Sequence, residues 1–372
     1  MAVISAAAMA LSCQKNSLAV TSSSFGRLST GEEVTLYHLT NSNGASMDVI
    51  DFGCRIVKIC VPDRNGVIDD VVVGPGDLET FEKGDRFMGC VIGRYGNRIN
   101  HSSFTLDGVK YDLVANENLD GEPVQCHGGV EGFDTKMWES EAVTGEGRVG
   151  VRMHRISPDG EQGYPGNLEC CVTYWLDDSN TVKVEYEAET DAPTVLNLSN
   201  HTYFNMKGSE GGYIMDHQLQ VEADQCVQNN LQYCPDLILP VEDTPFDFRE
   251  PHRVDYRIDM PSRHLEIMHG MSACWLVRDW DGSLRKASDV YEPRSGRGME
   301  TWTTEPALLT YTARGFSAEK YKGKYGPIDK FGGMLFETLH PADCPNQDRF
   351  PSTVLRPGEK YYSTTEFRFY TR

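Results

Sequence analysis

Apolar and polar residues alternate along most of the chain after residue 31. The clearest case is residues 181–189 (TVKVEYEAE), in which every second residue is apolar. Because successive side chains of a strand point to opposite faces of a sheet, this alternation predicts a strand with one buried and one charged face. Residues 172–176 are rich in β-formers, and the polar link 177–180 (DDSN) between the two segments predicts a hairpin.

Further hairpins are predicted by glycine-containing turns between short apolar segments. Asp107-Gly108 separates residues 104–106 from residues 109–111, and Gly145 to Gly147 precede the apolar residues 149–151. The pair Asp-Gly is a strong short-range hairpin signal. Residues 361–370 are rich in threonine and aromatic residues, a composition typical of strands.

Helical signals are few, because no segment of a dozen residues carries apolar positions at a spacing of three and four. The 35 glycines and 18 prolines are spread along the chain, as expected for many strands and turns. We find no internal repeat and no linker of low complexity after residue 31. The pattern predicts an all-β protein with one large, mostly antiparallel, sandwich-like domain over residues 32–372 and few short helices.

The first 31 residues differ from the rest of the chain. They contain no acidic residue and are rich in alanine and serine. We interpret residues 1–31 as an N-terminal tail, either disordered or a targeting segment for a plastid or another organelle. A secretory signal is disfavoured because the apolar start carries no positive charge, and because two glycosylation sequons, at Asn197 and Asn200, fall within a candidate active-site motif.

The eleven cysteines are an odd number without regular spacing, which disfavours a disulfide scaffold or a zinc site and favours a reducing compartment. We therefore expect a cytoplasmic protein, with an organelle as the alternative. The chain has 35 basic and 55 acidic residues and a formal charge of −20. This balance disfavours nucleic acid and anionic membrane partners, which need basic patches. No run of 18 apolar residues predicts a transmembrane helix.

Several common mechanisms lack their motifs. The chain contains no G-x-S-x-G, no Walker-type phosphate-binding loop and no H-E-x-x-H. The ten histidines show no spacing typical of metal ligands. We therefore expect no catalytic metal and no nucleotide cofactor.

Five polar islands between the predicted strands carry the candidate chemistry. Taken singly, each is compatible with an ordinary satisfied loop. Glu337 stands out because it follows Phe336 in an apolar segment, where a carboxylate is either paired or has a raised pKa, and both suit a general base. The islands are residues 93–100 (GRYGNRIN), 127–134 (HGGVEGFD), 197–205 (NLSNHTYFN), 336–346 (FETLHPADCPN) and 350–359 (FPSTVLRPGE).

Taken together, the islands resemble the aldose 1-epimerase family, also called galactose mutarotases. They match its motifs G-R-x-x-N-R-I, H-G-G-x-x-G-F-D, N-L-(S/T)-N-H-x-Y-F-N, E-T-Q-x-x-P-D-x-x-N and F-P-x-x-x-L-x-P-G-E in the family's order. The resemblance covers nearly all of the chain after residue 31. It implies a galactose-mutarotase-like β-supersandwich with a cleft for a small-molecule carbohydrate substrate, no metal and no nucleotide.

The resemblance also implies residue roles in the interconversion of α and β anomers of an aldohexose such as galactose or glucose. The general base falls on Glu337 and the general acid on His201. A base that takes the C1 hydroxyl proton and an acid that protonates the ring oxygen suffice to open the ring. The sugar-binding positions are His127, Asn97, Arg98 and, from the segment T-T-(Q/E)-P, Glu305.

Two recognition positions depart from the family pattern. Ser272 stands where the family has a sugar-binding Asp, and Leu339 replaces the Gln of E-T-Q. These departures leave two alternatives to a mutarotase of free hexoses: an epimerase or isomerase of a modified sugar or a non-sugar lactol, and a carbohydrate-binding protein without catalysis. A phosphorylated sugar is disfavoured, because phosphate recognition needs a basic cluster beyond Arg94 and Arg98. The sequence does not predict the oligomeric state.

Overall fold

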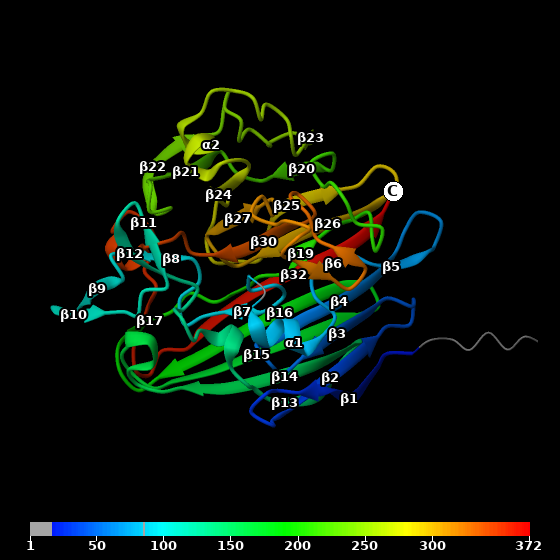
Figure 1. Cartoon of the computed structure of the whole chain (residues 1–372), viewed down its shortest axis with the longest axis horizontal. Coiled ribbons are helices and arrows are strands. Elements are labelled where there is room, and N and C mark those ends of the chain that lie inside the picture. Colours follow the sequence, from blue (N-terminus) through cyan, green and yellow to red (C-terminus); the bar gives the residue numbers. More distant parts are fainter. Residues whose placement is uncertain (1–16, 85) are drawn as a thin grey trace, which may run out of the picture.

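The computed structural model describes residues 17–84 and 86–372, and the first sixteen residues of the predicted tail lie outside the described residues. The strand pairs within its sheets are antiparallel, and they form a layered β structure (Figure 1). The prediction of an all-β protein with few short helices is confirmed. Two short α-helices are present in the described residues, α1 (Leu78–Lys83) and α2 (Arg263–Met268), each begun by a side-chain cap from Asp77 or Ser262.

The largest sheet has nine strands and contains the predicted hairpins of the middle of the chain. Residues 181–189 lie in a strand whose alternate side chains are buried, and it pairs with the strand that holds residues 172–176. In spatial order the strands are β13 (Glu139–Gly145), β14 (Arg148–Ser157), β15 (Leu168–Asp177), β16 (Thr181–Thr190), β32 (Tyr361–Thr371), β26 (Arg297–Thr303), β25 (Arg285–Tyr291), β20 (Gln218–Val221) and β23 (His252–Arg253).

A seven-stranded sheet provides the floor of the candidate site. Its central strands are joined in exact register, with Ser272 opposite Tyr311, and Leu309 opposite Glu337. In spatial order the strands are β22 (Pro235–Pro240), β21 (Gln225–Asn229), β24 (Ser272–Leu276), β27 (Ala307–Tyr311), β30 (Met334–Leu339), β19 (Tyr203–Phe204) and β6 (Val72–Val73).

A five-stranded sheet is formed by the N-terminal strands and begins within the predicted tail. Its strands are β1 (Ala19–Arg27), β2 (Glu33–Thr40), β3 (Ser46–Ile50), β4 (Arg55–Pro62) and β5 (Ile68–Asp70). Strand β1 pairs with β2 along its whole length. The folded part of the chain therefore starts at or before Ala19 rather than at residue 32, because residues 19–27 form the edge strand of this sheet. Their weak alternation of apolar and polar residues does not reveal this strand in the sequence.

Smaller sheets cover the ends of the large ones. A three-stranded sheet holds β11 (Glu117–Leu119), β12 (Glu122–Cys126) and β8 (Arg98–Asn100). The two-stranded pairs are β9 (Ser103–Leu106) with β10 (Val109–Asp112), β7 (Val91–Ile92) with β18 (Ser199–Asn200), β17 (Thr194–Val195) with β31 (Val354–Leu355), and β28 (Lys322–Gly323) with β29 (Gly326–Pro327). Short 3₁₀ turns occur at Phe133–Thr135, Glu161–Gly163 and Cys344–Asn346.

The main core lies between the large sheets. Met47 of β3, Tyr174 of β15, Val184 of β16 and Trp275 of β24 belong to one cluster of fully buried side chains. The indole N–H of Trp275 donates to the backbone oxygen of Phe246 at 3.1 Å, so that this large side chain is buried without an unsatisfied donor. The shared core holds the sheets, and hence the segments between their strands, in fixed relative positions.

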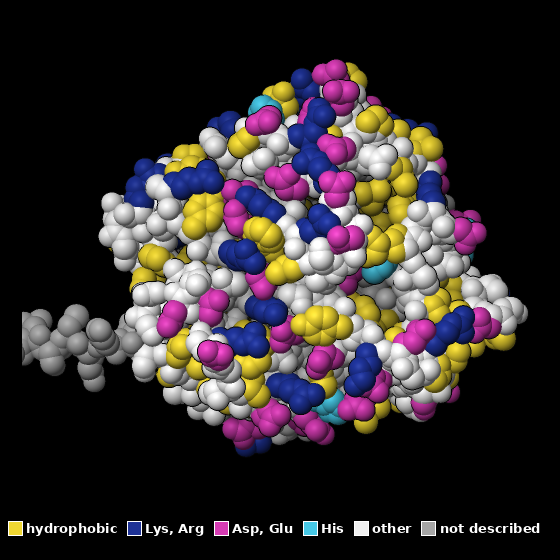
Figure 2. Space-filling model, turned by 180° about the vertical axis from the view of Figure 1, so that it is seen from behind, with side chains coloured by type: hydrophobic (Ala, Val, Ile, Leu, Met, Phe, Trp, Pro, Cys, Tyr) yellow, Lys and Arg dark blue, Asp and Glu magenta, His cyan; other side chains and the backbone are white. Residues whose placement is uncertain are grey.

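The surface carries charges of both signs. Figure 2 shows one face, on which Lys and Arg side chains are interspersed with Asp and Glu. Within residues 17–84 and 86–372, none of the helices has the length and apolar character to cross a membrane.

Candidate active site

A cleft of about 440 Å³ opens over the seven-stranded sheet, within the size range of small-molecule sites. Strands β24, β27 and β30 supply its floor, and segments before β8, after β12 and after β18 supply its walls. The cleft brings together six of the seven site residues predicted from the sequence: Asn97, Arg98, His127, His201, Ser272 and Glu337.

Glu337 lies in the middle of β30, where it is paired with Leu309 of β27. Its side chain is only 2% exposed, and burial raises its pKa to about 8, while the charge of Arg98 acts in the opposite direction. Its Oε1 is buried and has no hydrogen-bond partner within the described residues. A carboxyl group in this setting accepts or releases a proton near neutral pH, as a general acid–base group must.

His201 follows β18 and is fixed through its backbone. Its N–H donates to the oxygen of Cys90 at 2.8 Å, and its own backbone oxygen accepts from Gly89 N at 3.0 Å. The ring is buried, and its Nδ1 has no hydrogen-bond partner among the described residues. Burial, with the nearby positive charges of Arg86, Arg55 and Arg98, lowers its pKa to about 3.

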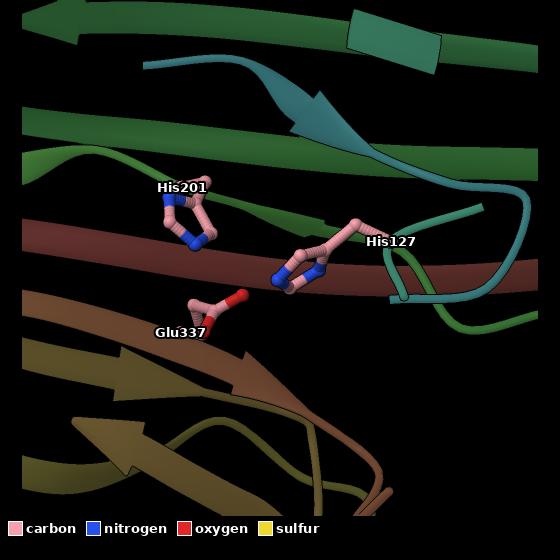
Figure 3. A group of neighbouring side chains, drawn as sticks. All are labelled: His127, His201 and Glu337. Atoms are coloured by element: carbon pink, nitrogen blue, oxygen red, sulfur yellow. The ribbon is translucent and has the colours of Figure 1, made fainter. Parts of the chain in front are cut away.

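His127 faces His201 and Glu337, and the three side chains point toward one another (Figure 3). The backbone N–H of Asn97 donates to Nδ1 of His127 at 3.1 Å, so the neutral ring carries its proton on Nε2. Burial and the nearby charges of His201 and Arg98 lower its pKa well below the ordinary value. The glycine that follows His127 is required by geometry, because a Cβ on Gly128 would lie 1.9 Å from the backbone oxygen of Gly93.

Asn97 and Arg98 lie beside this trio. The Oδ1 of Asn97 is buried without a partner among the described residues, which leaves an acceptor for a bound hydroxyl. Arg98 makes two hydrogen bonds to Glu117, from Nε at 2.7 Å and from Nη2 at 3.0 Å, and lies 5.0 Å from the ring of Tyr233. Its charge is therefore balanced within the protein by Glu117.

Ser272 lies on β24 with its side chain toward the cleft. Its backbone oxygen accepts a 2.8 Å hydrogen bond from His264, and the other ring nitrogen of His264 accepts from Asn229 N. Buried His264 therefore ties the start of β24 to the end of β21 and fixes Ser272. Across the strand pair, Ser272 faces Tyr311.

Glu305 does not line this cleft, contrary to the expectation from the family motif. It lies before β27, four residues from Leu309, or about 13 Å along an extended chain. Its buried carboxylate pairs with His340 at 2.8 Å and accepts from Tyr361 at 3.1 Å, beside a second cavity that also contains Trp280. Glu305 therefore belongs to a separate polar network.

Leu339, the other departure noted in the sequence, also lies outside the cleft lining. It is fully buried and pairs with Ala307 at the far end of β30. The expectation that its apolar side chain changes sugar recognition is therefore not supported by its position. Ser272 is the departure that lies in the cleft.

One cluster of side chains that could bind a metal is not apparent from the spacing of histidines in the sequence. Nitrogen atoms of His127 and His201 and a carboxylate oxygen of Glu337 lie within 4.8 Å of one another. Zinc holds such ligands at about 2.0–2.2 Å, so ligand atoms of one ion are at most about 4.4 Å apart. The donor set is suitable for zinc, although the side chains would have to close further around an ion.

The sequence also missed several cleft residues, which belong to no motif. Arg86 and Phe87 precede β7, and both have backbone φ values near +60°. The ring of Phe87 packs 4.8 Å from that of His127 and 5.8 Å from that of His201. Tyr311 at the end of β27 and Arg314 just after it complete this wall. Positive φ in two successive residues that are not glycine cannot be read from sequence.

Comparison with known proteins places this chain in a family. A sequence profile described as aldose 1-epimerase matches residues 35–368. The chain belongs to the aldose 1-epimerase family.

Its relatives include human galactose mutarotase, 37% identical over 356 residues that cover 94% of this chain and 98% of the relative, and Escherichia coli aldose 1-epimerase, 30% identical with coverage of 91% and 96%. Among solved structures, an aldose epimerase homologue from C. elegans superimposes with a TM-score of 0.80 at 27% identity, covering 90% of this chain and 98% of the other. Galactose 1-epimerase from Lactobacillus acidophilus superimposes with a TM-score of 0.82 at 24% identity, covers 95% of this chain and 99% of its own, and has the same fold.

Proposed function

We propose that this protein is an aldose 1-epimerase, an isomerase that interconverts the α and β anomers of an aldohexose by opening the ring. Glu337 is the base that takes the C1 hydroxyl proton, and His201 is the acid that protonates the ring oxygen. After the open aldehyde rotates about its C1–C2 bond, the same two transfers run in reverse on the other face. Support comes from the family membership and from the convergence of Glu337, His201 and His127 in one cleft.

The protonation states of the free protein match the middle of this cycle. With a pKa of about 8 for Glu337 and about 3 for His201, the pair holds one proton at neutral pH, and Glu337 carries it. Ring opening starts with the pair's one proton on His201, which gives it to the ring oxygen while Glu337 takes the proton of the C1 hydroxyl. The pair therefore ends the step with one proton, now on Glu337. The buried cleft therefore favours protonated Glu337 with neutral His201, the form that accompanies the open-chain intermediate. Before the ring opens, the bound sugar must stabilise the other form, ionised Glu337 with protonated His201.

The remaining cleft residues hold the sugar. The Nε2–H of His127 is a donor near the reacting carbon, and Oδ1 of Asn97 is a free acceptor for a hydroxyl. Arg98 and Ser272 offer further polar contacts along the cleft wall and floor. Because these groups are fixed by backbone hydrogen bonds or by Glu117, they are positioned before substrate arrives, which favours binding in one orientation.

The experiment that tests this function follows the optical rotation of freshly dissolved α-galactose and α-glucose with and without the protein. Faster approach to the same final rotation is expected, and it should be lost in Glu337→Gln. If the wild-type protein binds hexoses but accelerates no aldose, it is a carbohydrate-binding protein and the proposal fails.

We propose the cytoplasm as the compartment. The ten cysteines of the described residues are all buried free thiols, as expected in a reducing environment. The sequon residues Asn197 and Asn200 are 0% and 3% exposed, so neither is available for glycosylation in the folded protein. Fractionation of cells that express the full-length protein would test this, and recovery from an organelle would support the targeting alternative.

A further inference from the structure

The cleft contains more positive charge than the proposed reaction requires. Arg86, Arg98 and Arg314 all line it, whereas Glu117 and Glu337 are the acidic residues of the lining. Glu117 is already paired with Arg98 through two hydrogen bonds. Glu337 holds a proton near neutral pH, because burial raises its pKa to about 8. Among the described residues, the guanidinium groups of Arg86 and Arg314 are therefore left without a balancing charge at the site.

Arg314 is the more strongly under-satisfied of the two. Within residues 17–84 and 86–372 it makes no salt bridge and no hydrogen bond, and its Nε is a buried donor without a partner. Its one described contact is with the ring of Tyr311, 5.7 Å from the guanidinium carbon. A buried donor in this state costs free energy unless a ligand supplies the acceptor. Asn97, His201 and Glu337 contribute the other partnerless buried atoms of the cleft, all next to the reacting centre.

Arg86 extends the same positive wall. Among the described residues it has no carboxylate partner, and its contacts are with Tyr321, through a 3.3 Å hydrogen bond and a ring 5.9 Å away. A Cβ built on Gly315 would lie 2.8 Å from the hydroxyl of Tyr311 and 3.2 Å from Nη2 of Arg86. The Tyr311 hydroxyl and the Arg86 guanidinium thus both lie next to Gly315, the residue that directly follows Arg314.

The position of this wall relative to Glu337 fits one substrate molecule. Leu309 lies opposite Glu337, and Tyr311 lies two residues further along β27. Two residues of a strand span about 7 Å, so the backbone of Tyr311, whose ring contacts Arg314, lies about one sugar ring along β27 from the position opposite Glu337. The central strands of the floor contribute Ser272, Leu309, Tyr311 and Leu335 to the lining, besides Glu337 itself.

We propose that the substrate is an aldose with an anionic group, a phosphate or a carboxylate, remote from C1, and that Arg314 and Arg86 bind this group. This inference rests on the proposed function. Guanidinium groups bind both kinds of oxyanion through paired, charge-assisted hydrogen bonds. A protein with a formal charge of −20 repels anions unless its site supplies local positive charge.

The sequence motifs alone disfavour a phosphorylated sugar, because they offer no basic cluster beyond Arg94 and Arg98. Arg94 is 2% exposed and donates to the backbone oxygens of Ser157, Pro165 and Gly166, so it belongs to the core. Arg86 and Arg314, which line the cleft together with Arg98, lie outside the motifs, in the segments before β7 and after β27.

The test measures anomer exchange by NMR saturation transfer for glucose, galactose, glucose 6-phosphate and glucuronate with the full-length protein. We expect kcat/KM for at least one of the two anionic sugars to exceed that for both neutral sugars by 10-fold or more. The two anionic substrates distinguish phosphate from carboxylate. Arg314→Gln should lower the ratio of anionic to neutral kcat/KM by roughly 10- to 100-fold, as expected for a lost hydrogen bond between charged groups.

Arg86→Gln should lower the same ratio, and because Arg86 is exposed this variant tests the proposal even if Arg314→Gln folds poorly. Arg294→Gln is the matched control, since this exposed arginine lies outside the cleft and should leave the ratio unchanged. Equal or better use of the neutral sugars, or an unchanged ratio in both cleft variants, overturns the inference and leaves the proposed function standing. Failure to accelerate any of the four sugars overturns the proposed function as well.

Discussion

The assignment of base and acid makes a direct prediction for single residues. Glu337→Gln keeps the shape of the side chain but cannot accept a proton, and His201→Asn keeps a donor but cannot release one. Each should lower kcat by roughly 10²- to 10⁴-fold, the range for a positioned proton-transfer group, with a smaller change in KM. Polarimetry on the best substrate measures both constants. The double variant should lose less than the product of the two factors, because neither transfer is useful without the other.

Asn97→Ala is the contrasting variant, because its free Oδ1 is assigned to a hydroxyl group rather than to the transferred protons. It should act mainly on KM. If Glu337→Gln keeps nearly full activity while Asn97→Ala abolishes kcat, the roles are wrongly assigned.

The pKa values of the same pair predict the pH dependence. The active pair needs one proton in total. As pH falls, the pair binds this first proton near pH 8 and a second, inhibitory proton near pH 3. We therefore expect kcat/KM, corrected for spontaneous mutarotation, to be flat from pH 5 to 7 and to fall about tenfold per unit well above pH 8. A loss of activity on raising the pH through 6.5 would instead show that His201 titrates with an ordinary imidazole pKa.

The histidine and carboxylate cluster also predicts the response to metal removal. The proposed proton transfers use His201 and Glu337, with His127 as a hydrogen-bond donor, and need no ion, although donor atoms of the three side chains lie within 4.8 Å of one another. EDTA followed by desalting should leave kcat and KM unchanged. The comparison is the untreated protein with its metal content measured. Activity lost in EDTA and restored by zinc would show that the cluster holds a metal in the active enzyme.

At the scale of single elements, the turn after β12 decides where His127 lies. Gly128 has φ of +90°, and a Cβ there would lie 1.9 Å from the backbone oxygen of Gly93, so the loop must move in Gly128→Ala. Gly121, in the turn before β12, has φ of +84° but no atom within 4 Å of its Cβ position. Both substitutions carry the same backbone strain, and only the first adds a clash.

We expect Gly128→Ala to lower the free energy of unfolding by about 1–3 kcal/mol more than Gly121→Ala, the usual cost of overpacking, and to lower kcat as His127 shifts. Urea denaturation and polarimetry measure the two effects. Equal stability and activity of the two variants would mean that the loop accommodates a side chain and does not fix His127.

Elements with a long alternating pattern could be predicted from sequence, and short ones could not. Residues 181–189 and the turns at Asp107-Gly108 and residues 177–180 lie in hairpins as expected. Strands β18 and β19 have two residues each, too few for any pattern, yet they place His201. The pairing of β16 with β32 joins segments about 180 positions apart, and no local pattern specifies it.

At the scale of the whole molecule, the sequence motifs located the chemistry but not the cleft wall. Motif residues such as His127, His201 and Glu337 converge because their segments are fixed between paired strands. Glu305 belongs to a matching motif but lies four residues beyond the cleft floor, since a motif records neighbours in sequence and not in space. Arg86 and Arg314 reach the cleft through strand pairing alone.

The N-terminal boundary gives the last prediction. Strand β1 pairs with β2 from Ala19 to Arg27, and Leu28, 7% exposed, packs with Val34 and Phe81 in a small separate core. A chain that starts at Glu32 would leave β2 as an unpaired edge and expose this core. Compared with a chain that starts at Ser17, it should lose at least about 2 kcal/mol of unfolding free energy, the value of one large buried apolar side chain. Its kcat should stay the same when folded, since no residue before Arg86 lines the cleft among those described. Urea denaturation of both chains measures the difference, and equal midpoints would show that residues 17–31 behave as the tail that the sequence predicted.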